Sequence, residues 1–254
     1  MSKILKAEYI DLKVKIGKAK ELLEDITAQN LATGILLDLV VQDVRPLCSF
    51  LRDYEGEQWS ALRAVAGSLE KSTQGRLISG LQEEDIVPFT NILLEGITAF
   101  ETDSTSPLSP FLTIAATLRK ATLSLLRTTI NLTNSSTEIC NHLNKDLSLP
   151  SLLCKTITSN PQLYVDADHH SKSGPAANVK EEQEKGESRF ELLVLSLGLI
   201  INFVQESEEV KDIVLGTNLA NDIKDIFETL ISRDVPPYYP RFVLRFSSRY
   251  PLIS

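Results

Sequence analysis

Two stretches of this sequence decide its fold: Leu126–Glu138, which reads LRTTINLTNSSTE, and Leu197–Glu209, which reads LGLIINFVQESEE. When the second is laid on the first at an offset of 71 residues, five of the thirteen positions are identical. Each stretch is typical of the end of an apolar helix, a tight turn and the start of a second helix at Ser-x-Glu. Neither helix can bury its apolar stripe alone, so the pattern predicts that neighbouring units stack to form a shared core.

The chain between the two stretches contains a polar segment, residues 159–188, with six acidic residues and few large apolar ones. Too little can be buried there to offset the entropy of ordering it, so we predict a disordered acidic insertion. Without its 30 residues the offset falls from 71 to 41, inside the roughly 40 to 47 residue period of HEAT and armadillo repeats. The predicted fold is therefore all-α: a right-handed α-solenoid of about five or six HEAT/armadillo-like helical hairpins with one disordered insertion.

Helical periodicity also dominates the rest of the chain, and no sustained period-2 alternation predicts a sheet. Helices are expected near 5–23, 32–44, 59–69, 85–100, 111–132, 189–204, 207–215 and 218–232. A capping box at Ser135–Glu138 predicts where one of them starts. We interpret 1–254 as a single helical-repeat domain whose Pro-rich tail, 234–254, cannot form a long helix.

Six residues form the signature of the repeat: Leu126, Ile130, Asn131, Leu197, Ile201 and Asn202. Leu197 and Ile201 are predicted to be buried, so that truncating either one would destabilise the fold. For the asparagines, the favoured explanation is an amide that bonds orphan carbonyls or the turn backbone near a helix end. Contact with a partner protein is the alternative.

The same residues carry a resemblance to a known family. The segment Leu195–Ser207 resembles the "LGLLINLVE" helix of wings-apart-like proteins, the cohesin release factors, and Leu125–Asn134 is similar to a preceding "LKVLINLTN" segment. The likeness covers about residues 110–215. It implies a nuclear, non-enzymatic factor that binds cohesin subunits and their HEAT-repeat regulators and promotes release of cohesin from chromatin. The alternative is a generic HEAT or armadillo scaffold with a different partner, and an enzyme of unrecognised type is the third candidate.

Composition excludes several classes of partner. The formal charge of −8 and an acidic pI argue against binding nucleic acid through the net field of the chain. The longest apolar stretch, Leu192–Val204, is 13 residues and too short to span a bilayer, and no signal peptide is expected at the start. Three widely spaced cysteines, Cys48, Cys140 and Cys154, favour core thiols in a reducing intracellular compartment over a disulfide framework.

The sequence offers little to a catalytic or metal site. His142 stands alone, and His169 and His170 fall in the predicted insertion, where no geometry could be held. There is no phosphate-binding glycine loop, no zinc-protease motif and no nucleophile elbow. We therefore predict no enzyme activity, no cofactor, no metal and no small-molecule substrate.

Three basic residues, Arg119, Lys120 and Arg127, form the most notable charged cluster. Lys120 and Arg127 lie seven residues apart, which places them on one face of the expected helix. A solvated helix face is the favoured interpretation of the cluster, and a docking patch for an acidic protein partner is the alternative.

Overall fold

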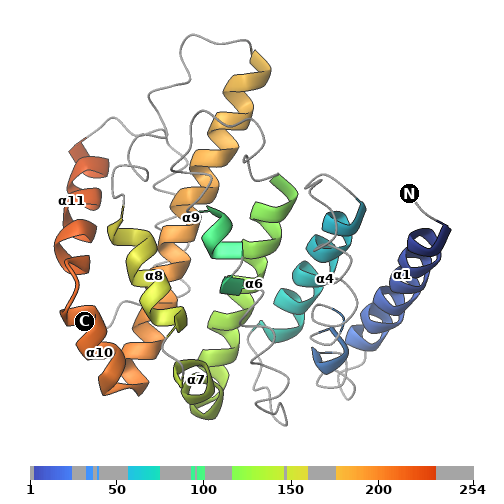
Figure 1. Ribbon diagram of the computed structural model, residues 1–254, viewed down its shortest axis with the longest axis horizontal. Helices are drawn as coiled ribbons and strands as arrows, with labels where there is room; N and C mark the ends of the chain where they lie inside the picture. Colours follow the sequence, from blue (N-terminus) through green and yellow to red (C-terminus); the bar gives the residue numbers. More distant parts are fainter. Residues whose placement is uncertain are drawn as a thin grey trace.

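The computed structural model of the chain consists of helices (Figure 1). It describes residues 3–24, 33–36, 39, 57–74, 93–94, 96–100, 116–145, 148–159 and 176–232. Over these ranges no residue lies in a strand, which confirms the all-α prediction. None of the helices in these ranges has both the length and the apolar character needed to cross a membrane. The predicted tail, 234–254, lies outside the described residues.

The labelled helices match the expected ranges most closely at α10 and α11, which begin one residue from the predicted starts. Their bounds are α1 Lys3–Glu24, α4 Glu57–Thr73, α6 Ala116–Ser135, α7 Thr137–Asn144, α8 Ser148–Thr158, α9 Ala176–Glu206, α10 Glu208–Leu215 and α11 Leu219–Ser232.

Three long helices, α4, α6 and α9, lie side by side, with α6 in the middle. Helix α1 packs against α4, while α8 packs against α9 and α11. Figure 1 shows the result as a row that runs from α1 at one end to α11 at the other. The first and last described helices therefore lie at opposite ends of the molecule.

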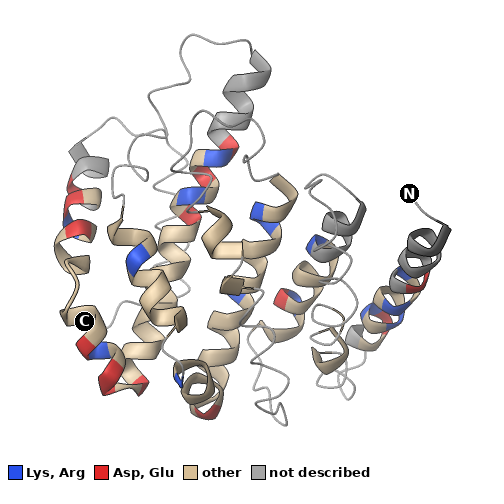
Figure 2. Ribbon diagram, in the orientation of Figure 1, with Lys and Arg blue, Asp and Glu red and all other residues tan. Residues whose placement is uncertain are grey.

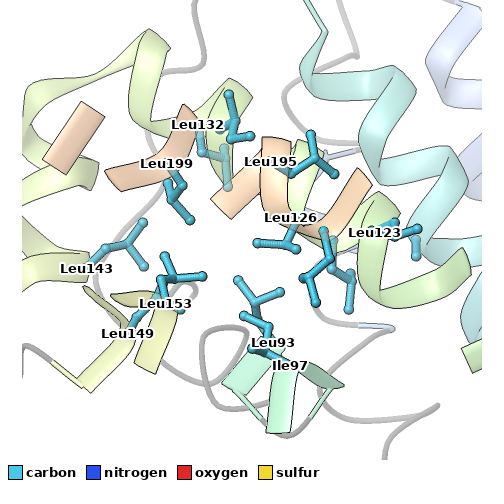
Figure 3. Close-up of a cluster of buried hydrophobic side chains, with 14 of the residues drawn as sticks. Leu93, Ile97, Leu123, Leu126, Leu132, Leu143, Leu149, Leu153, Leu195 and Leu199 are labelled. Atoms are coloured by element: carbon cyan, nitrogen blue, oxygen red, sulfur yellow. The ribbon is translucent and has the colours of Figure 1, made fainter. Parts of the chain in front are cut away.

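A leucine-rich core fills the space around α6 and α9 (Figure 3). Its side chains come from α6, α7, α8, α9 and the helical residues 93–94 and 96–100, and none of those labelled is more than 5% exposed. The labelled residues are Leu93, Ile97, Leu123, Leu126, Leu132, Leu143, Leu149, Leu153, Leu195 and Leu199. Leucine suits this position because it combines high helix propensity with a large apolar surface.

Buried threonines let other helices approach α6 closely. The hydroxyls of Thr122, Thr128 and Thr129 each donate to the carbonyl four residues earlier, at 2.9–3.0 Å. These bonds satisfy the polar atoms inside the helix, so burial costs little. The backbone at Gly96 approaches Thr122 closely: a Cβ added at Gly96 would lie 2.6 Å from the Thr122 Oγ1.

The structure corrects the predicted insertion, residues 159–188. Helix α9 begins at Ala176, so 176–188 is helical and not disordered, while residues 160–175 lie outside the described residues. The segment 176–188 is rich in Ala, Glu, Lys and Gln, which favour helix even where little apolar surface is available. Its end also packs, because Ser188 is only 9% exposed and its hydroxyl donates to the Glu184 carbonyl.

The turn from α6 to α7 has the same local geometry as the turn from α9 to α10. Ser136 and Ser207 are the N-caps, both with extended backbone (φ −155°, ψ 120° and φ −142°, ψ 119°). The Ser136 hydroxyl accepts from the Ile139 N–H at 3.3 Å, and the Ser207 hydroxyl accepts from the Val210 N–H at 3.4 Å. The helix bounds on either side of the two turns differ by the same 71 residues.

The predicted capping box at Ser135–Glu138 is wrong by one residue. Helix α6 extends through Ser135, whose hydroxyl donates back to the Leu132 carbonyl at 2.8 Å. That bond occupies the hydroxyl of Ser135, and Ser136 becomes the first residue with the extended backbone that a cap needs.

Candidate functional site between α4, α6 and α9

Arg119 does not lie on the predicted basic surface. Arg119 is only 3% exposed. The expectation that it belongs to a solvated or docking face is therefore wrong. Helical geometry gives the reason: Arg119 is four residues before Leu123 and seven before Leu126, both buried, so it shares their stripe.

Lys120 and Arg127 do share a face, as their spacing predicts, but carboxylates of the same chain already meet them. Arg127 Nη1 lies 3.2 Å from Glu70 Oε2 of α4, and its Nη2 contacts Glu191 of α9. Lys120 Nζ lies 3.9 Å from Glu184 Oε2 of α9. We call these five residues the interhelical charge cluster. Arg127 therefore links the three long helices α4, α6 and α9.

The cluster combines a tight and a loose ion pair. The side chains of Arg127 and Glu191 are 32% and 17% exposed, whereas those of Lys120 and Glu184 are 45% and 40% exposed. Water screens the second pair more, so its contribution to stability is small. Arg127 is thus a structural link, and Lys120 is the more available cation.

A pocket of about 320 Å³ opens beside the cluster. Its walls come from α4, α6 and α9 and are formed by Arg63, Gly67, Lys120, Leu123, Ser124, Arg127 and Glu191. Arg63 is exposed on the α4 wall, and Gly67 leaves open space where a side chain would stand. Arg63 and Lys120 can together offer two cations to a carboxylate that enters from outside.

Among these lining residues the only hydroxyl is that of Ser124, and the only carboxylate is that of Glu191, which contacts Arg127 Nη2. Across the described ranges, no group of three or more His, Cys, Asp and Glu residues is placed to hold a metal ion. His142 lies in α7, and His169 and His170 lie outside the described residues. The chemistry that the pocket itself supports is ion pairing.

The signature asparagines bond to neighbouring helices. Asn131 Nδ2 of α6 donates to Thr73 Oγ1 of α4 at 3.1 Å, and Asn202 Nδ2 of α9 donates to Thr133 Oγ1 of α6 at 2.8 Å. The favoured prediction, a bond to orphan carbonyls or to the turn backbone, does not describe these two bonds, whose acceptors are threonine hydroxyls. It does describe a second, longer bond of Asn131, whose Nδ2 donates at 3.5 Å to the Glu70 carbonyl in the last turn of α4.

Each threonine hydroxyl in these bonds both donates and accepts a hydrogen bond. Thr73 Oγ1 donates to the Leu69 carbonyl, and Thr133 Oγ1 donates to the Thr129 carbonyl, so both hydroxyl oxygens are free to accept from asparagine. The two Asn–Thr bonds join α4 to α6 and α6 to α9 in the same way. In α9 the residue two positions after the asparagine is Val204, which has no hydroxyl to accept a third such bond.

The apolar signature residues differ between the two units. Leu126 and Ile130 are 0% and 1% exposed, but Leu197 is only partly buried and Ile201 is 44% exposed. The prediction that Ile201 is buried is therefore wrong. Helix α6 lies between two long helices, whereas α9 has α6 on one side and only shorter helices among its other described neighbours.

The two described cysteines are core thiols, as predicted: Cys140 and Cys154 are buried and free. Burial, with the nearby Glu206 carboxylate, raises the pKa of Cys140 to about 12, although a hydrogen bond from Asn144 lowers it in part. Burial also raises the pKa of Cys154. Neither thiol is activated for chemistry at neutral pH. Cys48 lies outside the described residues.

Sequence reasoning missed Arg63, Glu70, Glu184 and Glu191. Glu70 is 57 residues from its partner Arg127, so no local spacing links them. The only signal in the sequence is that these helices carry acidic and basic residues. Many exposed residues on other helices do so too, so this signal does not identify the pairs.

Comparison with protein-family models, with curated proteins and with solved structures finds no match to this chain. The resemblance to wings-apart-like proteins thus depends on the two quoted segments.

Proposed function

We propose that this chain is a right-handed α-solenoid of HEAT/armadillo-like repeats that serves as a non-enzymatic scaffold for binding other proteins. The observation that supports it most is the matching geometry of α6–α7 and α9–α10. Both units have a serine N-cap at the same place in the turn, and each makes one Asn–Thr bond, from α6 to α4 and from α9 to α6. Stacked helical units of this kind present extended surfaces on which partners bind.

The site best suited to a partner is the pocket beside the interhelical charge cluster. Its free rim carries Arg63 and the loosely paired Lys120, and its volume suits one or two side chains. An acidic side chain of a protein partner matches both features.

The specific partner that we propose is cohesin, with its HEAT-repeat regulators, in the nucleus. Support for it is the likeness of Leu125–Asn134 and Leu195–Ser207 to segments of wings-apart-like proteins. In this role the scaffold would favour release of cohesin from chromatin by binding an open state of the ring more tightly than the closed state. A generic scaffold with another partner shares all the structural support.

Affinity purification of the tagged chain from cells, followed by mass spectrometry, separates the two. Enrichment of cohesin subunits supports the cohesin proposal, and a reproducible set of other proteins without cohesin contradicts it.

Arg63→Glu tests the pocket, and Lys71→Glu is its matched control because Lys71 is exposed on the same helix but does not line the pocket. We expect the captured set to fall several-fold with Arg63→Glu and to stay unchanged with Lys71→Glu. Equal capture by both variants would place the binding surface elsewhere.

A further inference from the structure

The side of α9 that faces away from α6 carries an apolar stripe. Asn202 and Val204 are two residues apart, so they point to nearly opposite sides of the helix. Asn202 donates to Thr133 of α6, and the side that carries Val204 therefore faces away from α6. Leu197, Ile201 and Val204 are spaced four and three residues apart and share this side. We call these three residues the outer stripe of α9.

The matching stripe of α6 is covered, whereas the outer stripe of α9 is partly open. At an offset of 71 residues the outer stripe corresponds to Leu126, Ile130 and Thr133, each no more than 7% exposed. Helix α9 packs against α6 on that side. In the outer stripe, by contrast, Ile201 is 44% exposed and the other two residues are only partly buried. The outer stripe is therefore the face on which one more element of the stack would pack.

The chain after α11 contains a segment that is similar to the middle of α9. Residues 241–248 read RFVLRFSS, and residues 189–196 of α9 read RFELLVLS, so four of the eight positions are identical. Phe242, Phe246 and Tyr250 follow one another at intervals of four, a spacing that places side chains on one face of a helix. Residues 241–250, which we call the tail segment, thus have the apolar pattern that the outer stripe requires.

The charges of the two surfaces are opposite in sign. Residues 205–212, just after the outer stripe, contain four acidic residues and one lysine. That lysine pairs with one of the carboxylates, and the other three, those of Glu206, Glu209 and Asp212, are exposed. Figure 2 shows acidic residues on α10, which packs against α9. Residues 233–254 contain four arginines and one aspartate, and guanidinium groups bind carboxylates with paired N–H donors.

The tail segment is within reach of the outer stripe. Helix α11 begins four residues after α10 ends, and its 14 residues span about 21 Å. Residues 233–240 join α11 to the tail segment and span up to about 26 Å when extended. Three of these eight residues are prolines, which favour an extended chain. This linker is long enough to return along the length of α11 toward the end of α9.

We propose that the tail segment covers the outer stripe of α9 and takes the place on α9 that α9 takes on α6. Its aromatic side chains lie against Ile201, and its arginines pair with the exposed carboxylates at the start of α10. A segment of the same chain is favoured over a second copy because the linker gives it a high effective concentration at this face. The inference goes beyond the proposed function, since it needs neither cohesin nor the pocket.

The reactivity of a cysteine at position 201 tests this in the full chain. With Ile201→Cys, the new thiol should react slowly with a maleimide because the tail segment covers it. Adding Phe242→Ser/Phe246→Ser, the tail variant, should raise that rate several-fold. Mass spectrometry of the peptide that contains position 201 separates this thiol from the buried Cys140 and Cys154.

Two controls separate cover by the tail segment from a general change in the fold. Ser247→Ala lies in the tail segment but removes no apolar surface, so it should leave the rate at position 201 unchanged. Val14→Cys places a thiol on α1, at a residue that is 50% exposed at the other end of the row. That thiol should react faster than the one at position 201, and the tail variant should not alter its rate.

A second measurement leaves the tail unchanged. A benzophenone amino acid at position 201 of the full chain, irradiated in dilute solution, should form cross-links to residues 241–254 of the same molecule. The same group at position 14 should not. A cross-linked dimer would show a second copy at this face and overturn the inference. Cross-links that miss residues 241–254, or a maleimide rate at position 201 that is equal with and without the tail variant, would overturn it too.

Discussion

The contact between Gly96 and Thr122 shows how a single atom sets the distance between two helices. A Cβ at Gly96 would lie 2.6 Å from Oγ1 and 2.9 Å from Cγ2 of Thr122. The threonine side chain cannot easily change its rotamer, because it is β-branched and its hydroxyl donates to the Leu118 carbonyl at 3.0 Å. The helical stretch around Gly96 can pack this closely only without a side chain at that position.

Replacing Gly96 by alanine should therefore lower the free energy of unfolding by about 1–3 kcal/mol, as other overpacked core changes do. Gly67→Ala is the matched control, because its added Cβ meets nothing within 4 Å. That change should raise stability by about 0.5–1 kcal/mol through helix propensity. Urea unfolding followed by circular dichroism measures both, and equal stability of the two variants would contradict the close packing.

The bond between Asn202 and Thr133 can be measured by a double-mutant cycle. Asn202→Ala and Thr133→Val should show a coupling of about 0.5–1.5 kcal/mol, the usual net contribution of one hydrogen bond. Thr129→Val is the control partner, because the Thr129 hydroxyl donates to the Leu125 carbonyl of its own helix. Asn202→Ala should be additive with Thr129→Val, and additivity in both cycles would show that the interhelical bond contributes nothing.

The buried thiol of Cys140 makes stability depend on pH in the alkaline range. Its pKa is raised to about 12 in the folded chain from an ordinary value of 9.0. Between these values the unfolded chain loses the thiol proton first, so stability falls as pH rises above 9. Relative to Cys140→Ala, the wild type should lose about 1 kcal/mol between pH 8 and pH 10. Urea unfolding of both proteins at the two pH values checks this, and a difference that does not change with pH would place the thiol in contact with water.

At the scale of helices, Arg127 of α6 is the link between α4 and α9. Arg127→Met leaves the partly buried carboxylates of Glu70 and Glu191 without their cation, and should lower stability by about 1–3 kcal/mol. Lys120→Met is the control on the same face and should change stability by less than about 0.5 kcal/mol, because its pair with Glu184 is exposed. Thermal unfolding at low and high salt compares the two, and similar losses for both would mean that Arg127 is not a structural link.

Helix positions could be predicted because apolar periodicity is a local property of the sequence. The ends of α10 and α11 follow from it within one residue. The start of α9 could not be predicted in the same way: the absence of apolar side chains argued for disorder, although the residues 176–188 are good helix formers. Low apolar content predicts weak burial, and it does not by itself predict the loss of a helix that continues from a buried one.

The candidate site could be predicted only in part, because its contacts join distant residues. Spacing alone placed Lys120 and Arg127 together, and helical geometry could have separated Arg119 from them. The carboxylates that meet these cations lie on other helices, so no local pattern indicates that the basic face is neutralised within the chain. Ile201 aligns with Ile130 in the repeat and is predicted to be buried for that reason, but α6 has a long helix on both sides and α9, among its described neighbours, has one only on the side of α6.

At the scale of the whole molecule, the proposed solenoid is stabilised by contacts between neighbours along the row. Helix α6 packs on α4 and α9, and α1 packs on α4. In such an array a defect at one end weakens the units near it and leaves distant units folded. A domain with a single cooperative core would lose stability everywhere at once.

Native-state hydrogen exchange of the Phe203→Ala variant tests this most directly. Phe203 is fully buried in α9, and its truncation should cost about 3–5 kcal/mol. We expect amide protection to fall strongly in α8, α9 and α10, to fall less in α6, and to stay near the wild-type value in α4. An equal loss of protection in all of these helices would contradict the stacked-repeat architecture.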